Sequence, residues 1–427
     1  MLGYSRGVAV LAALAALGAA PPVEPPDIEK NGLAPPVARP PDVTAVEVGR
    51  LVEGNREFAV ELYGAVRQSP GNVFLSPHSI SAALAMSFGG ARGETEAEMA
   101  RTLRFRLDQH RLHAAFAALQ ADLHEGAAAG DYQWHAANRL WGQRDYGILP
   151  AYRELTERYY GAPLEEVDFR SASEAARQAI NRWVELQTQE RIRDILPYGS
   201  LSADTRLVLA NAVYFFGNWE KPFSTVGTRP APFFVAPGEA VEVPLMYRLG
   251  HYRYAARDGV QLVEIPYRGG RLAMVVVLPA ERFGLAEVER QLTAARLEEW
   301  IGASRSRRVR IRLPRFRVEA AYRLGEPLGQ LGLRQVFGPG ADLTGMSPRG
   351  DLFLGEVYHK AFVEVNEHGT EAAAATVPEA PMAEPGPPPP PPIEFRADHP
   401  FLFILRDRKS GSILFLGRLA NPAALVE

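Results

Sequence analysis

Histidine, serine and lysine carry out much of covalent and metal-assisted catalysis, and in this chain they do not fall into catalytic spacings. Of the nine histidines, His110 and His113 lie three residues apart and could share a metal on a helix, but we favour an exposed helix face. Residues 45–427 contain no G-x-S-x-G elbow, and the chain has no Ser-x-x-Lys, G-x-x-x-x-G-K, G-x-G-x-x-G or H-E-x-x-H. The absence of cysteine excludes thiol catalysis, zinc–thiolate sites and disulfides. We therefore expect no catalytic residue, no cofactor and no metal, and we interpret the protein as a non-enzyme.

The overall charge gives no sign of a polyanionic partner. The net charge of the 427 residues is −3 and the isoelectric point is about 6.4, so we expect neither nucleic acid nor an anionic membrane surface as a partner. The run SRSRRVRIR (Ser304–Arg312) could bind a polyanion, although a solvated strand face is the interpretation we favour. We expect a monomer without a membrane anchor.

The first twenty residues have the pattern of a signal peptide. Arg6 supplies a positive start, Val8–Leu17 is an apolar run, and Gly18–Ala20 are small residues near a cleavage point. The apolar run is too short to span a bilayer, which takes about 20 residues. The alternative interpretation of these residues is an ordinary alanine-rich helix. The sequence does not assign the exact cleavage point. With residues 21–44 as a proline-rich tether, we predict an exported protein, either secreted or periplasmic.

The remainder, residues 45–427, reads as one domain in which helices precede strands. Helical spacing covers these stretches: Val48–Gln68, Ser76–Gly90, Gly93–Leu103, Leu112–Gly126 and Ser173–Ile192. Ser76 followed by Pro77 has the form of a helix N-cap. Apolar or alternating runs predict strands at Thr205–Phe216, Leu272–Pro279 and Val309–Glu319, and a hairpin at His399–Pro422. This order predicts an α+β fold.

Between two of the predicted strands lies a long segment with almost nothing to bury. Gly369–Pro392 reads GTEAAAATVPEAPMAEPGPPPPPP, and Val377 and Met382 are its only large apolar residues. A loop of this length inside a compact domain is usually functional or disordered. Its first part alternates small side chains at period two, which suits a segment that can become a central strand.

Taken in order, five stretches resemble the serpin family. They are Asn72–Met86, Leu207–Phe223, Val263–Tyr267, His359–Thr376 and Phe395–Asp407. The resemblance implies a single domain with three β-sheets, a large central sheet, about nine helices and an exposed reactive loop, here residues 367–395. It implies a suicide inhibitor of serine proteases: the protease cleaves the loop and forms an acyl-enzyme, and the cleaved loop inserts into the central sheet. The partner would be a serine protease held covalently.

Within this loop the resemblance assigns a hinge and a scissile bond. The hinge residues are Glu367, Gly369, Thr370, Glu371, Ala372, Ala373, Ala374, Ala375 and Thr376. Counting from Glu367 at the loop base places the scissile bond between Ala383 and Glu384, with Met382 as the alternative preceding residue. Ala383 suits elastase-like or subtilisin-like proteases, and Met382 would shift the target toward chymotrypsin-like or broad elastase-like enzymes.

The resemblance also assigns residues that control opening of the central sheet. Arg315 takes the place of a family lysine that pairs with Glu367, and Trp219 matches a tryptophan under the top of the sheet. Ser76, Ser79, Asn211 and His359 match a polar cluster beneath its middle. For each of these residues ordinary packing or hydrogen bonding is the simpler interpretation.

Two prolines depart from what loop insertion needs. Pro378 and Pro381 lie in the part of the loop that should become strand, and proline cannot donate to a strand ladder. The alternative function is therefore a non-inhibitory serpin that is cleaved as a substrate or acts as a binding or chaperone-like protein. The small hinge residues favour the inhibitor.

Overall fold

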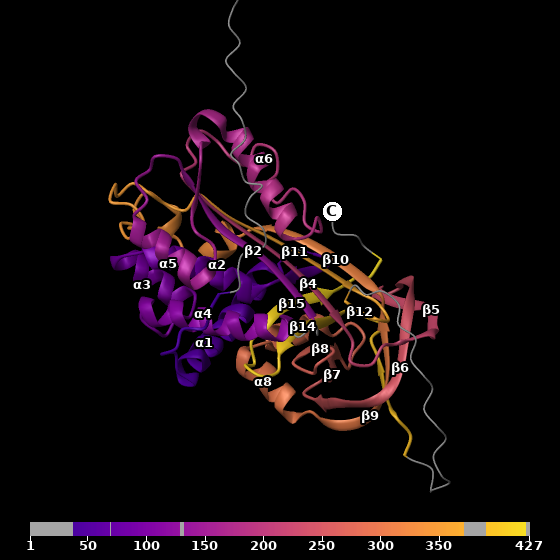
Figure 1. The fold of residues 1–427 in the computed structure, drawn as a ribbon. Helices are drawn as coiled ribbons and strands as arrows, with labels where there is room; N and C mark the ends of the chain where they lie inside the picture. Colours follow the sequence, from indigo (N-terminus) through magenta and orange to yellow (C-terminus); the bar gives the residue numbers. More distant parts are fainter. Residues whose placement is uncertain (1–36, 69, 129–131, 371–389, 424–427) are drawn as a thin grey trace, which may run out of the picture.

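The computed structural model describes residues 37–68, 70–128, 132–370 and 390–423, and Figure 1 shows their fold. The helices are α1 (Ala45–Val66), α2 (Pro77–Gly90), α3 (Gly93–Thr102), α4 (Gln109–Ala128), α5 (Pro150–Tyr160), α6 (Phe169–Gln187), α7 (Leu285–Gln291), α8 (Ala294–Ala303), α9 (Gly325–Gln330) and the 3₁₀ helix η2 (Gln335–Phe337). The strands before residue 300 are β1 (Val73–Leu75), β2 (Tyr132–Gln143), β3 (Glu165–Val167), β4 (Leu207–Asn218), β5 (Ser224–Ala236), β6 (Glu239–Arg257), β7 (Val260–Pro266) and β8 (Leu272–Pro279). The later strands are β9 (Arg305–Pro314), β10 (Phe316–Arg323), β11 (Glu356–Val365), β12 (Gly369–Thr370), β13 (Ile393–Arg396), β14 (Phe401–Asp407) and β15 (Ile413–Leu419).

The expected α+β fold is confirmed, and the helix caps explain where two of its helices begin. Thr44 and Glu47 form a capping box at the start of α1. At the start of α2 the Ser76 side chain accepts a hydrogen bond from the Ser79 backbone N–H, and Pro77 occupies the first helical turn. Every residue of α2 is buried, so this helix lies inside the molecule.

Hydrogen bonding joins the described strands into two sheets. The first has nine strands in the order β1-β15-β14-β8-β7-β6-β9-β13, with β5 also paired to β6. The 19-residue β6 pairs with β5, β7 and β9 along its length, and so connects what would otherwise be separate sheets. The second sheet has six strands in the order β10-β11-β12-β4-β2-β3. In Figure 1 the helices α1–α5 gather at one end of the molecule, and β5, β6 and β9 lie at the other.

The six-stranded sheet is covered on both faces. On one face α6 packs Ile180 and Trp183 in a cluster with Ala212 and Phe362 of the sheet. On the other face lie α2 and the nine-stranded sheet, whose side chains form the two larger clusters of the core. Strands buried on both faces explain the nearly unbroken apolar sequences of β4 and β8.

The prediction of one continuous strand over Val309–Glu319 was wrong. The chain breaks at Arg315: β9 ends at Pro314 and pairs with β6, whereas β10 starts at Phe316 and pairs with β11 in the other sheet. The alternating pattern continues through the break, so it cannot show that the strand changes sheets. The Arg315 backbone N–H bonds to the carbonyl of Pro244 at this corner.

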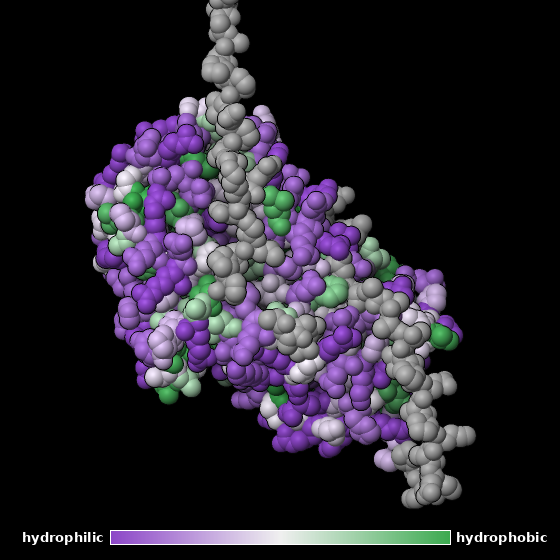
Figure 2. Space-filling model, viewed as in Figure 1, coloured by the Kyte–Doolittle hydropathy of each residue, from purple (hydrophilic) through white to green (hydrophobic). Residues whose placement is uncertain are grey.

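The face of the molecule seen in Figure 2 is mainly hydrophilic, and its apolar residues stand in small separate groups. The large apolar side chains exposed in the described chain are distributed over different elements and loops: Val46, Leu186, Tyr198, Val226 and Phe283. None of the described helices combines the length and apolar character that a membrane span requires.

Candidate functional site

The structure describes only the two ends of the long loop that follows β11. Of the predicted hinge it includes Glu367, Gly369 and Thr370. The other hinge residues and the predicted scissile bond lie outside the described residues: Glu371, Ala372, Ala373, Ala374, Ala375, Thr376, Met382, Ala383 and Glu384. The geometry of the site is therefore that of the loop base and of the sheet beneath it.

The loop base is anchored through Glu367. Its side chain is buried, and its carboxylate accepts two hydrogen bonds from the Arg315 guanidinium, at 2.7 and 2.6 Å, and one from the Thr228 hydroxyl at 2.6 Å. Burial alone would raise the pKa of Glu367, but the bonds from Arg315 and Thr228 outweigh it and lower the pKa below its ordinary value. The carboxylate therefore stays charged and fixes the start of the loop to the corner between β9 and β10.

The next residues of the loop already belong to the six-stranded sheet. Gly369 and Thr370 form β12, which pairs with Asn218 and Gly217 of β4 and with Val365 of β11. A Cβ atom on Gly369 would lie 2.0 Å from the carbonyl oxygen of Gly217, so only glycine fits here. The loop therefore enters the sheet as a strand rather than leaving it.

The side chain of Thr370 points into the protein interior. It is completely buried, and its hydroxyl lies 2.8 Å from the hydroxyl of Tyr267. Tyr267 is itself buried, which raises the pKa of its hydroxyl and keeps it neutral. It stacks on Trp219, with 4.5 Å between ring centroids.

Trp219 holds the chain just before β12. Its indole Nε1–H donates to the carbonyl of Asn366 at 2.9 Å, and its backbone N–H donates to the carbonyl of His368 at 2.8 Å. Because Trp219 is almost completely buried, these bonds are shielded from water. The structure thus places Trp219 next to β12, in contact with Tyr267 and with the chain that leads into the loop.

Farther from the loop base, three polar side chains lie in a row across the sheet, one each on β11, β4 and β2. His359 on β11 is paired with Asn211 on β4, which in turn is paired with Asn138 on β2. His359 Nδ1 lies 2.5 Å from Asn211 Oδ1, and its Nε2 accepts the backbone N–H of Ser76 at 3.1 Å. Ser79 Oγ accepts from Asn211 Nδ2 at 2.8 Å.

Burial lowers the pKa of His359 to about 3, so the ring is neutral at physiological pH. With Nε2 accepting a hydrogen bond, the proton is on Nδ1 and is donated to Asn211. The structure thus brings together the four predicted cluster residues Ser76, Ser79, Asn211 and His359. It adds Asn138, which sequence reasoning missed; an amide within the otherwise largely apolar AANRLW (Ala136–Trp141) was the available signal.

The row lies where two strands run side by side and then part. Residues Glu356–Phe362 of β11 pair directly, in parallel, with Val208–Tyr214 of β4. Beyond that stretch β12 lies between them. The same two strands are therefore joined at the polar row and already separated at the loop base. Within the described ranges no group of three or more histidine, aspartate or glutamate side chains is placed to hold a metal ion.

Comparisons with known proteins agree with this geometry. A model of the family described as serpin (serine protease inhibitor) matches residues 53–422. The leukocyte elastase inhibitor of Sus scrofa is 44% identical over 383 residues, which are 87% of this chain and all of that protein. The Homo sapiens protein of the same name is 41% identical over 384 residues, with the same coverage. The crystal structure of uncleaved ovalbumin superimposes with a TM-score of 0.78 at 30% identity, covering 87% of this chain and 100% of that one. The chain therefore belongs to the serpin family.

Proposed function

We propose that this serpin inhibits elastase-like or subtilisin-like serine proteases by inserting its cleaved loop into the six-stranded sheet. A protease would attack the bond after Ala383, or after Met382, and form an acyl-enzyme. The loop would then extend β12 between β11 and β4 and carry the attached protease with it. Consistent with a non-enzyme, the protein would supply no nucleophile of its own.

The observation that carries the proposal is the position of β12. Gly369 and Thr370 already pair with both strands between which the loop must enter. Extension of the strand would add ladder hydrogen bonds on both sides, each contributing about 0.5–1.5 kcal/mol net. A dozen such bonds would favour insertion by on the order of 10 kcal/mol.

Continuing the register of β12 gives each hinge residue its neighbours in the inserted strand. Thr370 lies opposite Gly217 and Val365, so Ala372 would come to lie between Phe215 and Val363. These two side chains are buried, and a small residue between them adds no clash. The outward positions between would include Glu371, the one charged residue of the hinge beyond its anchored base at Glu367.

The same register would bring Thr376 to the polar row. It would lie between Asn211 and His359, which now bond directly to each other. A threonine hydroxyl both accepts and donates, so it could accept from His359 Nδ1 and donate to Asn211 Oδ1. Insertion would then replace the bond it breaks, without leaving a buried polar group unpaired.

The specificity rests on the residue preceding the scissile bond. Alanine at 383 fits the small pocket of elastase-like and subtilisin-like proteases, and lacks the positive charge that trypsin-like enzymes need. The relatives from Sus scrofa and Homo sapiens are named leukocyte elastase inhibitors, which supports an elastase-like target.

The second candidate is a non-inhibitory serpin that proteases cleave as a substrate. It is favoured by Pro378, which the same register would place between Leu209 and Val357, and by Pro381 beyond it. Each proline removes a ladder N–H, so pairing past Val377 would be weaker.

Incubation with pancreatic elastase, subtilisin, chymotrypsin and trypsin separates the two functions. The inhibitor would give a covalent complex that survives denaturing electrophoresis, and a released peptide beginning at Glu384, or at Ala383 if Met382 precedes the bond. Cleavage by every protease without any such complex would show that the protein is a substrate and not an inhibitor. A rise in melting temperature after loop cleavage would report insertion separately.

We further propose that residues 1–20 direct export and are removed. The apolar run Val8–Leu17 behind Arg6 supports this proposal. Expression with the native leader, followed by N-terminal sequencing of the mature protein, should give a start close to Pro21. Retention of Met1 in the mature protein would contradict it.

A further inference from the structure

The chain segment that leads into α1 is packed against the rest of the protein. Residues 37–43, which we call the strap, are the described part of the predicted proline-rich tether before Thr44, the N-cap of α1. The side chains at its two ends, Val37 and Val43, are 8% and 9% exposed and belong to a cluster of the hydrophobic core. The residues between them are exposed or half-buried. The strap therefore lies on the surface and is anchored by an apolar side chain at each end.

Ion pairs hold the strap along α4. Arg39 pairs with Asp122, toward the end of α4, at 2.9 Å. Arg111, in the first turn of α4, pairs with the Asp42 carboxylate and donates to the Asp42 carbonyl at 2.8 Å. The same guanidinium donates to Glu47, in the first turn of α1, at 2.6 Å. The strap thus runs antiparallel to α4 and ties that helix to the start of α1.

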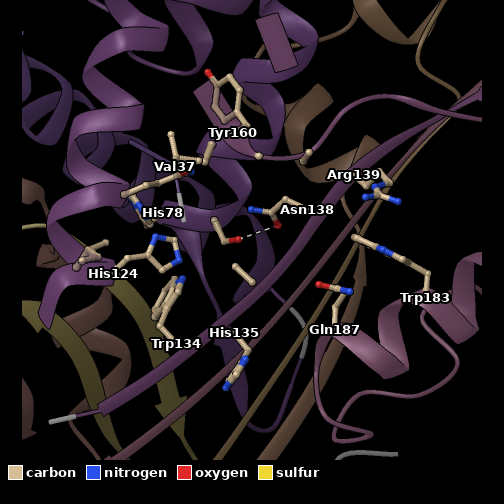
Figure 3. A pocket seen from close by; sticks show the side chains of 17 residues that line it. Val37, His78, His124, Trp134, His135, Asn138, Arg139, Tyr160, Trp183 and Gln187 are labelled. Carbon is tan, nitrogen blue, oxygen red and sulfur yellow. Dashed lines mark hydrogen bonds between the residues drawn. The ribbon is translucent and has the colours of Figure 1, made fainter. Parts of the chain in front are cut away.

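At its first residue the strap reaches a cavity of about 200 Å³, and Val37 forms part of the cavity wall. Residues of α2, α4, β2, α6 and the end of α5 form the rest of the wall. Figure 3 shows Val37 on the side of this cavity where His78 and Tyr160 lie, with Asn138 farther along it. The position of Val37 therefore links the strap to the space beside the six-stranded sheet.

The cavity borders one edge of that sheet. The part of β2 that lines it falls between Trp134 and Arg139, and this stretch pairs with β4 on one side. On its other side the described partner of β2 is β3, which pairs no earlier than Trp141. This part of β2 is thus a sheet edge, with the cavity beside it.

The proposed insertion would widen the sheet, and the two sides of the insertion point differ in their freedom to move. A strand that enters between β11 and β4 adds one strand spacing, about 4.8 Å. On the β11 side the sheet continues into β10, which is joined at Arg315 directly to β9 of the nine-stranded sheet. On the β4 side it continues into β2 and the edge beside the cavity. The β4–β2 side is therefore the one with space to move.

We propose that the strap restrains the widening of the sheet: it holds α4 and Val37 in place beside β2, and it must yield when β2 moves toward the cavity. A strand that moves into a cavity displaces part of its wall, because protein interiors resist compression. The strap is held by one valine at this wall and by surface ion pairs, which are individually weak, so it yields before the packed helices do. The strap acts on the proposed loop insertion and so rests on that part of the proposed function, but not on the trapping of a protease.

The test measures how fast the sheet accepts a strand from outside. The probe is a fluorescein-labelled peptide EAAAATV, the sequence of residues 371–377 that follow β12, and its association with the full chain is followed by fluorescence anisotropy. The double variant Val37→Ser/Arg39→Gln removes the apolar anchor and the pair with Asp122. We expect it to take up the peptide about tenfold faster than the wild type, since each tenfold in rate corresponds to about 1.4 kcal/mol of barrier.

Two control variants separate release of the strap from other effects. Arg101→Gln removes an ion pair of the same kind, with Glu94 at 2.9 Å on α3, and leaves the strap intact. Thr293→Ala removes the side-chain cap of α8 and so lowers stability away from the strap. Both should take up the peptide at the wild-type rate. A rate increase in Thr293→Ala as large as that of the double variant would show that lowered stability, and not the strap, controls opening.

The opposite change fastens the strap. Because the chain has no cysteine, Arg39→Cys/Asp122→Cys provides two unique thiols that a short bis-maleimide can join. The cross-linked protein should take up the peptide at least about fivefold more slowly than the same variant before cross-linking.

The outcomes distinguish the strap from the inhibitor. Equal uptake by the wild type, the released variant and the cross-linked variant would overturn the strap and leave the inhibitor standing. Faster uptake by the released variant, in a protein that never forms a covalent protease complex, would support the strap and remove the inhibitor. If no variant took up the peptide and loop cleavage left the melting temperature unchanged, the sheet would not open and both would fall.

Discussion

The hydroxyl of Thr370 lies 2.8 Å from that of Tyr267, and both side chains are buried. This bond joins the first residues of the loop to the loop between β7 and β8. Because Thr370 is already paired with β4 and β11, the native structure contains the first step of the strand that insertion would complete.

Removing the Tyr267 hydroxyl should destabilise the protein measurably. Tyr267→Phe leaves the Thr370 hydroxyl buried without its partner, at a cost of about 1–2 kcal/mol in the free energy of unfolding. Tyr254→Phe is the control, since the Tyr254 hydroxyl bonds to Gln261 at a partly exposed position. Urea unfolding of both variants gives the comparison; an equal loss of stability in the two would contradict the importance of the Thr370–Tyr267 bond.

If the protein is the inhibitor we propose, a charge facing into the sheet should convert it into a substrate. In Ala372→Arg the guanidinium would have to enter between Phe215 and Val363, where no water can solvate it. We expect complete cleavage by elastase without a stable complex. Glu371→Arg, one residue earlier and facing outward, should keep complex formation. If Ala372→Arg still formed as much complex as the wild type, the proposed register would be wrong.

The Arg315–Glu367 pair should make stability depend on pH. The pKa of Glu367 in the folded protein is below its ordinary value of 4.5, so its contribution is present above pH 4.5 and is lost as pH falls through the folded pKa. In the Arg315→Gln variant the buried Glu367 carboxylate would lose its charged partner, so burial would raise the pKa of Glu367. Stability would then fall as pH rises past 4.5. We expect a loss of about 2 kcal/mol at pH 7, reduced by the partial exposure of Arg315.

Unfolding experiments between pH 3 and 7 would measure the effect of Arg315→Gln. Adding Glu367→Gln should recover much of the stability at pH 7, because no buried charge then lacks a partner. An unchanged pH profile in the single variant would show that the ion pair does not control the ionisation of Glu367.

His359 should make the fold less stable in mild acid. Its pKa is about 3 when folded and 6.5 ordinarily, so below pH 6.5 the unfolded chain takes up a proton that the folded protein does not. The lost stability should reach about 1.4 kcal/mol per pH unit between pH 6 and 4. His359→Gln should remove this contribution and flatten the profile by that amount. His251→Asn, at an exposed position, should leave the profile unchanged.

Much of the fold could be predicted because local signals and tertiary packing agree. The Ser76–Pro77 start of α2 and the apolar runs of β4 and β8 occur in the structure as the patterns indicated. The pattern failed where alternation continues but the partner changes: Val309–Glu319 reads as one strand, yet Arg315 turns the chain from one sheet to the other. No periodicity encodes which sheet a strand joins.

The sequence by itself determined the family, five of the early helices, and the small alternating side chains of the predicted hinge. Only the tertiary structure decided that Gly369 and Thr370 already form a strand, that Asn138 completes the polar row, and that Arg139 is buried against Trp183 of α6. The reason is physical. Side-chain size and spacing are local properties, whereas the partner of a buried donor or strand edge depends on residues far away in the chain, which only folding brings into contact.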